Sequence, residues 1–239
     1  CMPGQGDFPL ADYAAAIRRI GYDGYWSLEI FNDRFRAGSG NQVARDGHRS
    51  LRLLEDQAAR VLHLPPPMPP RVVASGFEFI EFAAAQEEAE EFGRFFTALG
   101  FAPVARHRSK DVVRWQQGAI NLVINSEPEG LAHSFDIVHG GSVCALGIAV
   151  ADQQAALARA AALDIPRFAQ AVGPEEWEIP SLRAVGGSLL YLVDAASRDR
   201  MWAEEFPQPL PGTPRCDLTR VDHVAQAMHY EEFLSWLLY

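Results

Sequence analysis

Two residues of this sequence are candidate metal ligands. Glu29 lies within the apolar run Trp26–Phe31. A carboxylate that is buried alone costs several kcal/mol, so a glutamate in such a run should be paired or bound to a metal. The alternative is a structural ion pair with an arginine such as Arg34 or Arg36. Position alone does not separate these two interpretations.

The other candidate is His223, in the motif VDHV at residues 221–224. If this motif is a strand, alternation places Val221 and His223 on one face and Asp222 and Val224 on the other. The imidazole then points into the cup of a sheet beside an apolar neighbour, as a metal ligand would. A core histidine that binds a backbone carbonyl produces the same pattern, so a lone histidine does not decide between the two.

A charged loop with Asp33, Arg34 and Arg36 follows Glu29. An arginine there could hold a substrate carboxylate through a bidentate pair. Solvated loop charge explains the same residues and is the favoured interpretation. The remaining histidines have no facial-triad spacing, so surface or capping roles are predicted for them; they are His48, His63, His107, His133, His139 and His229.

Composition narrows the class of protein. The chain has 239 residues, of which 48% are hydrophobic and 22% charged, and a formal net charge of -10. This composition is globular, and the acidic balance with scattered basic residues disfavours nucleic acid or an anionic membrane as partner. A small neutral or anionic metabolite fits better. Three distant cysteines suggest neither a disulfide framework nor a zinc knuckle, and no membrane span or export signal is visible, so a cytoplasmic location is expected.

Before a proline-rich segment the pattern predicts a helix over 11–20, a strand over 25–31 and an amphipathic helix over 42–62. The long helix has Val43, Leu51, Leu54 and Val61 on its apolar side and Arg45, Arg49, Arg52 and Glu55 on its exposed side. The prolines at 65–67, 69 and 70 end it and predict an extended linker, where we place a domain boundary.

A repeat of ~65 residues follows the linker. The first βαβββ unit is predicted as a strand over 77–83, a helix over 87–99 and strands over 101–107, 112–116 and 120–125. The second has a strand over 144–150, a helix over 153–163 and strands over 166–171, 177–182 and 189–193. A third unit opens at Thr219, with a helix over 230–238. Since the chain opens at Cys1 in a loop and stops within FLSWLLY, we expect a piece of a longer protein.

The segment GYDG followed by SLEIFND resembles the last βα units of the sugar phosphate isomerase/epimerase TIM-barrel family. That family holds a divalent metal at the top of the barrel, and Glu29 matches the ligand from its eighth strand. In barrels the C-terminal ends of the strands form the catalytic face. The resemblance therefore implies a metal such as Mg, Mn or Co at Glu29.

The repeats resemble the vicinal-oxygen-chelate fold, and GFEFIEFA, FFTALGF, ARHRSKDV and INLVIN are similar to the N-terminal half of 4-hydroxyphenylpyruvate dioxygenases. In that family the N-terminal pair of units has no metal, whereas the C-terminal pair holds Fe(II) through two histidines and a glutamate. His223 matches the first of these histidines, and Phe79 stands at the corresponding place in the first unit. Phe79 should therefore be buried at the centre of the sheet.

The resemblances together imply an α/β and α+β chain: the C-terminal end of a TIM barrel, then paired βαβββ glyoxalase/dioxygenase-like units. The expected domains are the barrel end (1–64), the linker (65–75), the N-terminal half of the dioxygenase-like domain (76–206) and the start of its C-terminal half (207–239). This arrangement resembles bacterial fusion proteins whose metal-dependent barrel is a 3-dehydroshikimate dehydratase that forms protocatechuate. The alternatives are an iron-dependent 4-hydroxyphenylpyruvate dioxygenase, or a non-catalytic domain that orders or oligomerises the barrel. The partner expected is a small-molecule substrate, with a homo-oligomer possible.

Overall fold

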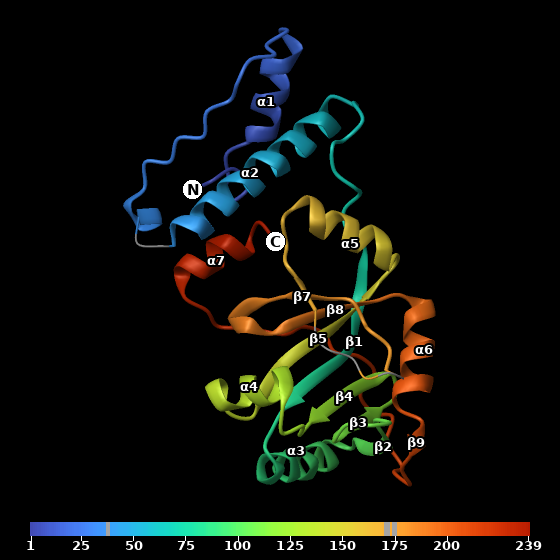
Figure 1. Ribbon diagram of the computed structural model, residues 1–239. Coiled ribbons are helices and arrows are strands. Elements are labelled where there is room, and N and C mark those ends of the chain that lie inside the picture. The colour runs from blue at the N-terminus through green and yellow to red at the C-terminus, as the bar shows by residue number, and fades with distance from the viewer. Residues whose placement is uncertain (37–38, 170–172, 174–175) are drawn as a thin grey trace. The chain divides into compact units, whose positions relative to one another are not determined.

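The computed structural model describes residues 1–36, 39–169, 173 and 176–239 (Figure 1). The side chains of Arg34, Arg36 and Glu231 also lie outside the described part. The chain forms two compact units. Unit 1 comprises Cys1–Arg71, Leu157–Ile165 and Gln226–Tyr239, and unit 2 comprises Val72–Ala156 and Pro166–Ala225. No helix in the described part combines the length and apolar character needed to cross a bilayer.

Unit 2 contains the strands predicted for the two repeats. Its strands are β1 (Ala74–Ala83), β2 (Ala102–Arg106), β3 (Val112–Gln117), β4 (Ile120–Asn125), β5 (Ser142–Val150), β6 (Arg167–Phe168), β7 (Ser181–Arg183), β8 (Leu189–Val193) and β9 (Gln208–Pro209). β6 and β7 are shorter than predicted, and residues 170–171 of the sixth predicted strand lie outside the described residues.

The described strands form one mixed sheet in the order β6-β7-β8-β5-β1-β4-β3-β2-β9. β1 runs parallel to β4 and β5 runs parallel to β8, while β1 and β5 pair antiparallel at the centre. Moving outward from β1 the strands are β4, β3 and β2, and moving outward from β5 they are β8, β7 and β6. The two βαβββ units are thus equivalent halves of a paired sheet, and the predicted fold is confirmed.

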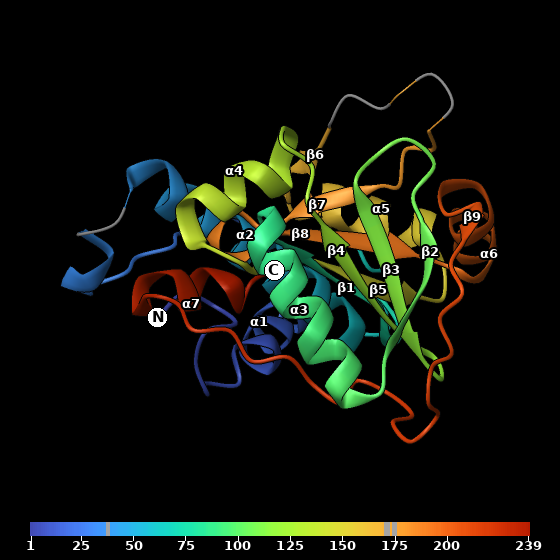
Figure 2. The same cartoon turned by 90° about the horizontal axis from the view of Figure 1, so that it is seen from below.

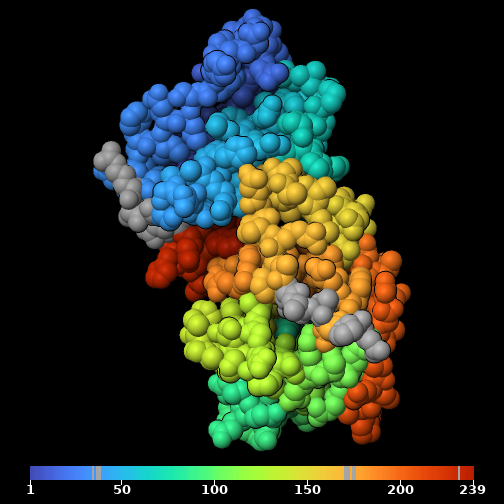
Figure 3. All heavy atoms as spheres, viewed as in Figure 1, coloured from blue at the N-terminus to red at the C-terminus, as the bar shows by residue number. Residues whose placement is uncertain are grey.

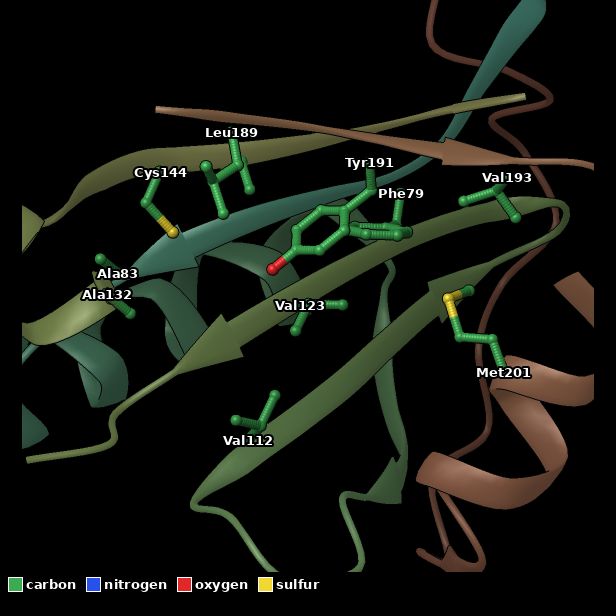
Figure 4. Close-up of a cluster of buried hydrophobic side chains, with 11 residues drawn as sticks. Phe79, Ala83, Val112, Val123, Ala132, Cys144, Leu189, Tyr191, Val193 and Met201 are labelled. Atoms are coloured by element: carbon green, nitrogen blue, oxygen red, sulfur yellow. The ribbon is translucent and has the colours of Figure 1, made fainter. Parts of the chain in front are cut away.

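One face of this sheet, here called the inner face, carries a hydrophobic cluster (Figure 4). Phe79 of β1 lies at its centre and is 5% exposed. Its ring contacts Tyr191 and Trp202, with centroid distances of 5.6 and 6.0 Å. It also faces Gly147 of β5, where a Cβ atom would lie 2.4 Å from the Phe79 ring. Only glycine fits at position 147 without displacing the aromatic ring.

The outer face is covered by α3 (Gln86–Leu99), as Figure 2 shows. Phe92 and Phe96 of this helix pack against Ile80, Leu122 and Ile124 of the sheet. Two layers therefore bury both faces of the central strands, which is why residues 122–124 of β4 are all apolar rather than alternating with polar residues.

Two helices of unit 2 are not predicted from the sequence: α4 (Gly130–His139) and α6 (Ala195–Glu205). α6 places Met201 and Trp202 in the inner-face cluster. Its N-cap is Asp194, whose carboxylate accepts a 2.8 Å hydrogen bond from the Ser197 N–H. That hydrogen bond lowers the pKa of Asp194. The capping interaction fixes where this covering helix begins.

Unit 1 contains α1 (Leu10–Arg19), the 3-10 turn η1 (Asp33–Arg36), α2 (Gly40–Val61) and α7 (Tyr230–Trp236). α1 and α2 pack through Ala14, Ala15 and Ala58. α5 (Gln153–Ala162) begins in unit 2 and ends in unit 1. The atoms of α7 (red) lie against those of α2 (light blue) in Figure 3. The helices predicted over 11–20, 42–62 and 230–238 are confirmed.

The strand predicted over residues 25–31 is wrong: this segment is extended but belongs to no sheet. Strand 221–224 is wrong for the same reason. A strand exists only where a neighbour completes its backbone hydrogen bonds, and neither segment has such a neighbour among the described residues.

Candidate metal centres

Glu29 lies in the extended segment between α1 and η1, and its side chain is exposed. The neighbouring Leu28 is partly buried and points at α2, where a Cβ atom on Gly47 would lie 3.3 Å from its methyl group. The segment thus uses Leu28 for packing and leaves the Glu29 carboxylate in solvent. Because the carboxylate is exposed, Glu29 carries no desolvation cost that a metal or an arginine would have to offset. Arg34 and Arg36, its alternative ion-pair partners, have side chains outside the described residues.

His223 is also exposed, with 81% of its side chain accessible. Its Nδ1 atom lies 2.9 Å from a carboxylate oxygen of Asp222. The predicted alternation does not occur, because this segment forms no strand. Val221 instead packs against the cluster on the outer face of the sheet. The expectation that the imidazole points into the cup of a sheet is therefore not met within this chain.

A cavity of about 210 Å³ adjoins the segment that precedes His223. Its wall is formed by the start of β1, the β3–β4 turn and the segment 219–222. The charged residues of the wall are Arg220 and Asp222, whose side chains lie 3.8 Å apart. The cavity is therefore a small space with one exposed ion pair, and Phe79 forms part of its apolar side.

Phe79 occupies the place in the first unit that corresponds to His223, and its predicted burial is confirmed. Figure 4 shows its ring surrounded by apolar side chains of β4, β8 and α6. Glu81, two residues along β1, accepts a 2.7 Å hydrogen bond from Asn125. Burial raises the pKa of Glu81, and the Asn125 hydrogen bond opposes that rise. At this place β1 thus supplies the Phe79 ring and, two residues along the strand, the Glu81 carboxylate.

The two candidates were predicted for separate metal sites, and they belong to different units: Glu29 to unit 1 and His223 to unit 2. Across the described residues, no group of three or more His, Cys, Asp or Glu side chains is placed to hold a metal ion. A 2-His-1-carboxylate site needs three protein ligands. Each candidate is therefore at most one ligand of a site.

A buried polar cluster was missed by the sequence analysis. His107, for which a surface or capping role is predicted, is buried: its Nε2 lies 3.0 Å from the Glu205 carboxylate, and the two side chains are 9% and 5% exposed. Its Nδ1 accepts from the backbone N–H groups of Ser109 and Lys110. Burial lowers the pKa of His107, while Glu205 raises it. These contacts fit a neutral ring protonated at Nε2.

Glu176 lies in the same cluster. It accepts hydrogen bonds from Lys110 (2.8 Å), Ser109 (2.6 Å) and the backbone N–H of Gly173 (2.9 Å). Although burial raises its pKa, these hydrogen bonds lower the pKa to about 2. The cluster joins the β2–β3 loop to residues distant in sequence, so local spacing contained no signal for it. Since every carboxylate named here already has a hydrogen-bonding partner, we regard the cluster as structural.

Two charged residues of the sheet, Glu78 and Arg114, contact Trp202 of α6 and stabilise that helix on the sheet. Glu78 of β1 accepts a 2.8 Å hydrogen bond from the Trp202 indole, and the Arg114 guanidinium lies 3.9 Å from the centre of that ring. Burial raises the pKa of Glu78 and lowers the pKa of Arg114 to about 10. Arg114 also donates two hydrogen bonds to Asn121. Each charge has a partner of its own, Trp202 for Glu78 and Asn121 for Arg114, so neither needs a ligand.

Known proteins resemble this chain on both sides of its linker. The family model Glyoxalase_5, described as hydroxyphenylpyruvate dioxygenase, HPPD, N-terminal, matches residues 69–204, more than half of the chain. A 3-dehydroshikimate dehydratase of Pseudomonas putida is 42% identical over 249 aligned positions, which cover 100% of this chain and 39% of that protein. A 4-hydroxyphenylpyruvate dioxygenase of a Pseudomonas species is 44% identical over 119 positions, covering 50% of this chain and 33% of that protein.

A solved structure described as a xylose isomerase-like TIM barrel/4-hydroxyphenylpyruvate dioxygenase fusion protein aligns with the whole chain. The TM-score is 0.90 and the sequence identity 42%, and the alignment covers 39% of that structure. The chain therefore spans about two fifths of the length of the relatives that it matches from end to end.

Proposed function

We infer the function from the family of this chain: it belongs to the hydroxyphenylpyruvate dioxygenase N-terminal family through residues 69–204. We propose that it is part of a longer metal-dependent 3-dehydroshikimate dehydratase that forms protocatechuate. In this proposal residues 1–64 are the end of the catalytic barrel and residues 76–239 begin a dioxygenase-like domain. The observation that carries the proposal is that a dehydratase is 42% identical along the whole chain, on both sides of the linker.

In the proposed barrel site Glu29 is one ligand of a divalent metal, either Mg, Mn or Co. Its carboxylate is an oxygen donor of the kind that these ions prefer, and it is exposed rather than used in packing. A bound metal there supplies Lewis-acid polarisation of a substrate carbonyl. Arg34 and Arg36 are candidates to hold the substrate carboxylate, with solvated loop charge as the alternative role. We assign no residue of this chain to proton transfer.

In the dioxygenase-like domain His223 is the proposed first ligand of Fe(II) or another divalent metal. The Asp222 carboxylate engages its Nδ1 and leaves Nε2 free to bind. Metal-binding histidines commonly have such a carboxylate partner on the nitrogen that does not bind the metal, because it fixes the tautomer and the ring orientation. The donor set available here fits the ligand role, with two further protein ligands required.

A second candidate function is 4-hydroxyphenylpyruvate dioxygenase activity in that domain, favoured by the family match and by the 44% identity to such an enzyme. A non-catalytic ordering or oligomerising role is the third candidate. It is favoured by the apolar inner face around Phe79. A small-molecule substrate, a cytoplasmic location and a possible homo-oligomer complete the proposal.

The dehydratase proposal can be tested in the full-length protein encoded by the gene that contains this chain. Conversion of 3-dehydroshikimate to protocatechuate is measured at limiting metal for wild type, Glu29→Gln and the control Glu55→Gln, an exposed glutamate on α2. Loss of a ligand should weaken metal binding and activity by ~10-fold or more. Full activity of Glu29→Gln would remove Glu29 from the metal site, and absence of conversion by wild type would reject the dehydratase itself.

A further inference from the structure

α2 buries charged residues on the side predicted to be exposed. Arg49 is 3% exposed and Asp46 is 4% exposed, whereas Arg45 on the same helix is exposed. A buried guanidinium is costly unless charge and hydrogen bonds compensate it. The partners of these two residues therefore show what this face of α2 is built to contact.

Arg49 binds the end of α5. Its Nε donates to the Leu163 carbonyl at 2.5 Å and its NH2 group donates to the Asp164 carbonyl at 2.7 Å. Both carbonyls lie just beyond Ala162, the last residue of α5, where helical partners end. A positive charge also interacts favourably with the C-terminal end of a helix. Arg49 is thus a cap for a helix that belongs to the repeats after the linker.

Asp46 binds α7 while it pairs with Arg49. One carboxylate oxygen lies 3.6 Å from the Arg49 guanidinium, and the other accepts a hydrogen bond from the Ser235 hydroxyl. α7 is further fixed by Leu234 and Leu238, which are 7% and 1% exposed, and by Gln5, which donates to the Leu234 carbonyl at 2.7 Å. The C-terminal segment is thereby part of the same core as the N-terminal residues.

We propose that the Asp46–Arg49 face of α2 is a docking surface for residues 157–165 and 226–239 of the same chain. Both segments follow the linker in the sequence, and residues 157–165 lie within the family match, yet the two segments form one compact unit with residues 1–71. If the two segments moved away from α2, Asp46 and Arg49 would remain charged but would lose hydrogen-bonding partners. The surface therefore favours these two segments over an arbitrary apolar partner. These two segments therefore help to hold residues 1–71, independently of which reaction those residues serve.

Hydrogen exchange of the 239-residue chain tests this coupling. We expect Arg49→Met to accelerate amide exchange in residues 157–165 and 230–238 by ~100-fold or more, because breaking a buried pair costs several kcal/mol and each 1.4 kcal/mol is tenfold. Exchange in β1 and β5 should be unchanged. Arg45→Met removes the same charge from an exposed position one turn earlier, and it should leave the exchange rates of both segments unchanged.

Arg49→Lys keeps the charge but cannot reproduce the two guanidinium hydrogen bonds, so it should accelerate exchange in both segments to a smaller extent. If Arg49→Met loses protection from exchange throughout the chain, the milder variant Arg49→Lys still tests whether the two segments depend on the guanidinium hydrogen bonds. The proposal is overturned if Arg49→Lys leaves residues 157–165 and 230–238 as protected as in wild type, or if Arg45→Met exposes them equally.

Discussion

The same kind of aromatic strand pattern has opposite outcomes before and after the linker. Phe79, in the pattern FEFIEFA, is 5% exposed in a strand with neighbours on both sides. Tyr25 and Phe31, at the two ends of the predicted strand 25–31, are 101% and 93% exposed. The difference in burial depends on whether neighbouring strands are present, and not on the residue types. A pattern predicts a preference for extended backbone, and the neighbouring strands decide whether a buried strand forms.

The buried polar residues and the proposed metal ligands also differ in whether they have partners within the chain. The paired units of unit 2 satisfy their buried polar groups internally, as Glu78, Glu176 and His107 show. The two proposed metal ligands, Glu29 and His223, instead lie on extended segments outside the sheet and have exposed side chains. The described chain thus contains a packed region whose buried polar groups are paired internally and two exposed residues proposed as metal ligands.

The largest effect should come from removing the central ring. Phe79→Ala should lower the free energy of unfolding by about 3–5 kcal/mol, because it leaves a cavity in a packed core. Phe31→Ala, at an exposed position, should change it by less than about 0.5 kcal/mol. Urea denaturation of both variants measures the contrast. Equal destabilisation would mean that residue 31 is packed and that the comparison between the two regions fails.

Acid should destabilise unit 2 through Glu176. Its folded pKa of about 2 lies below the ordinary 4.5, so its contribution is present above about pH 4.5 and is lost as the pH falls towards 2. The full shift corresponds to about 3 kcal/mol as an upper value. His107 acts in the same direction, since its lowered pKa makes protonation unfavourable in the folded state. Urea midpoints from pH 7 to pH 3 should fall less steeply in Glu176→Gln than in wild type or in Glu55→Gln. If the urea midpoints of all three proteins fell equally with pH, Glu176 would not contribute to the loss of stability in acid.

A smaller effect is expected at the close contact between the two repeats. Gly147→Ala should cost about 1–3 kcal/mol, because its Cβ atom would lie 2.4 Å from the Phe79 ring. The double variant Phe79→Leu/Gly147→Ala should be less destabilised than the sum of the two single variants, since the smaller side chain makes room. Additive values in thermal unfolding would show that the two residues do not meet.

Much of unit 2 was predictable from the sequence, because β1, β4, β5 and β8 are largely apolar strands that recur in the same order in the two repeats. α4 and α6 were not, since their hydrophobic periodicity is weak and their packing against the sheet is a long-range property. Arg49 illustrates a different limit. A charged residue on the polar side of an amphipathic helix is normally exposed, and Arg49 is buried because the carbonyls beyond α5 and the Asp46 carboxylate pair with its guanidinium.

The sequence predicted individual candidate ligands but not how they are arranged in space. The sequence indicated Glu29 and His223 by residue type and resemblance, but their geometry depends on strands that need neighbours. His107 and Glu176 were missed because their partners are distant along the chain and no local spacing connects them.

The most direct test of the central contrast is the iron content of the full-length protein, measured by mass spectrometry for wild type, His223→Ala and the control His229→Ala, an exposed histidine in the same region. If His223 is a metal ligand and the inner face around Phe79 binds none, His223→Ala should lose its iron while the dehydration of 3-dehydroshikimate stays nearly intact, and His229→Ala should match wild type. Unchanged iron stoichiometry in His223→Ala would contradict the account.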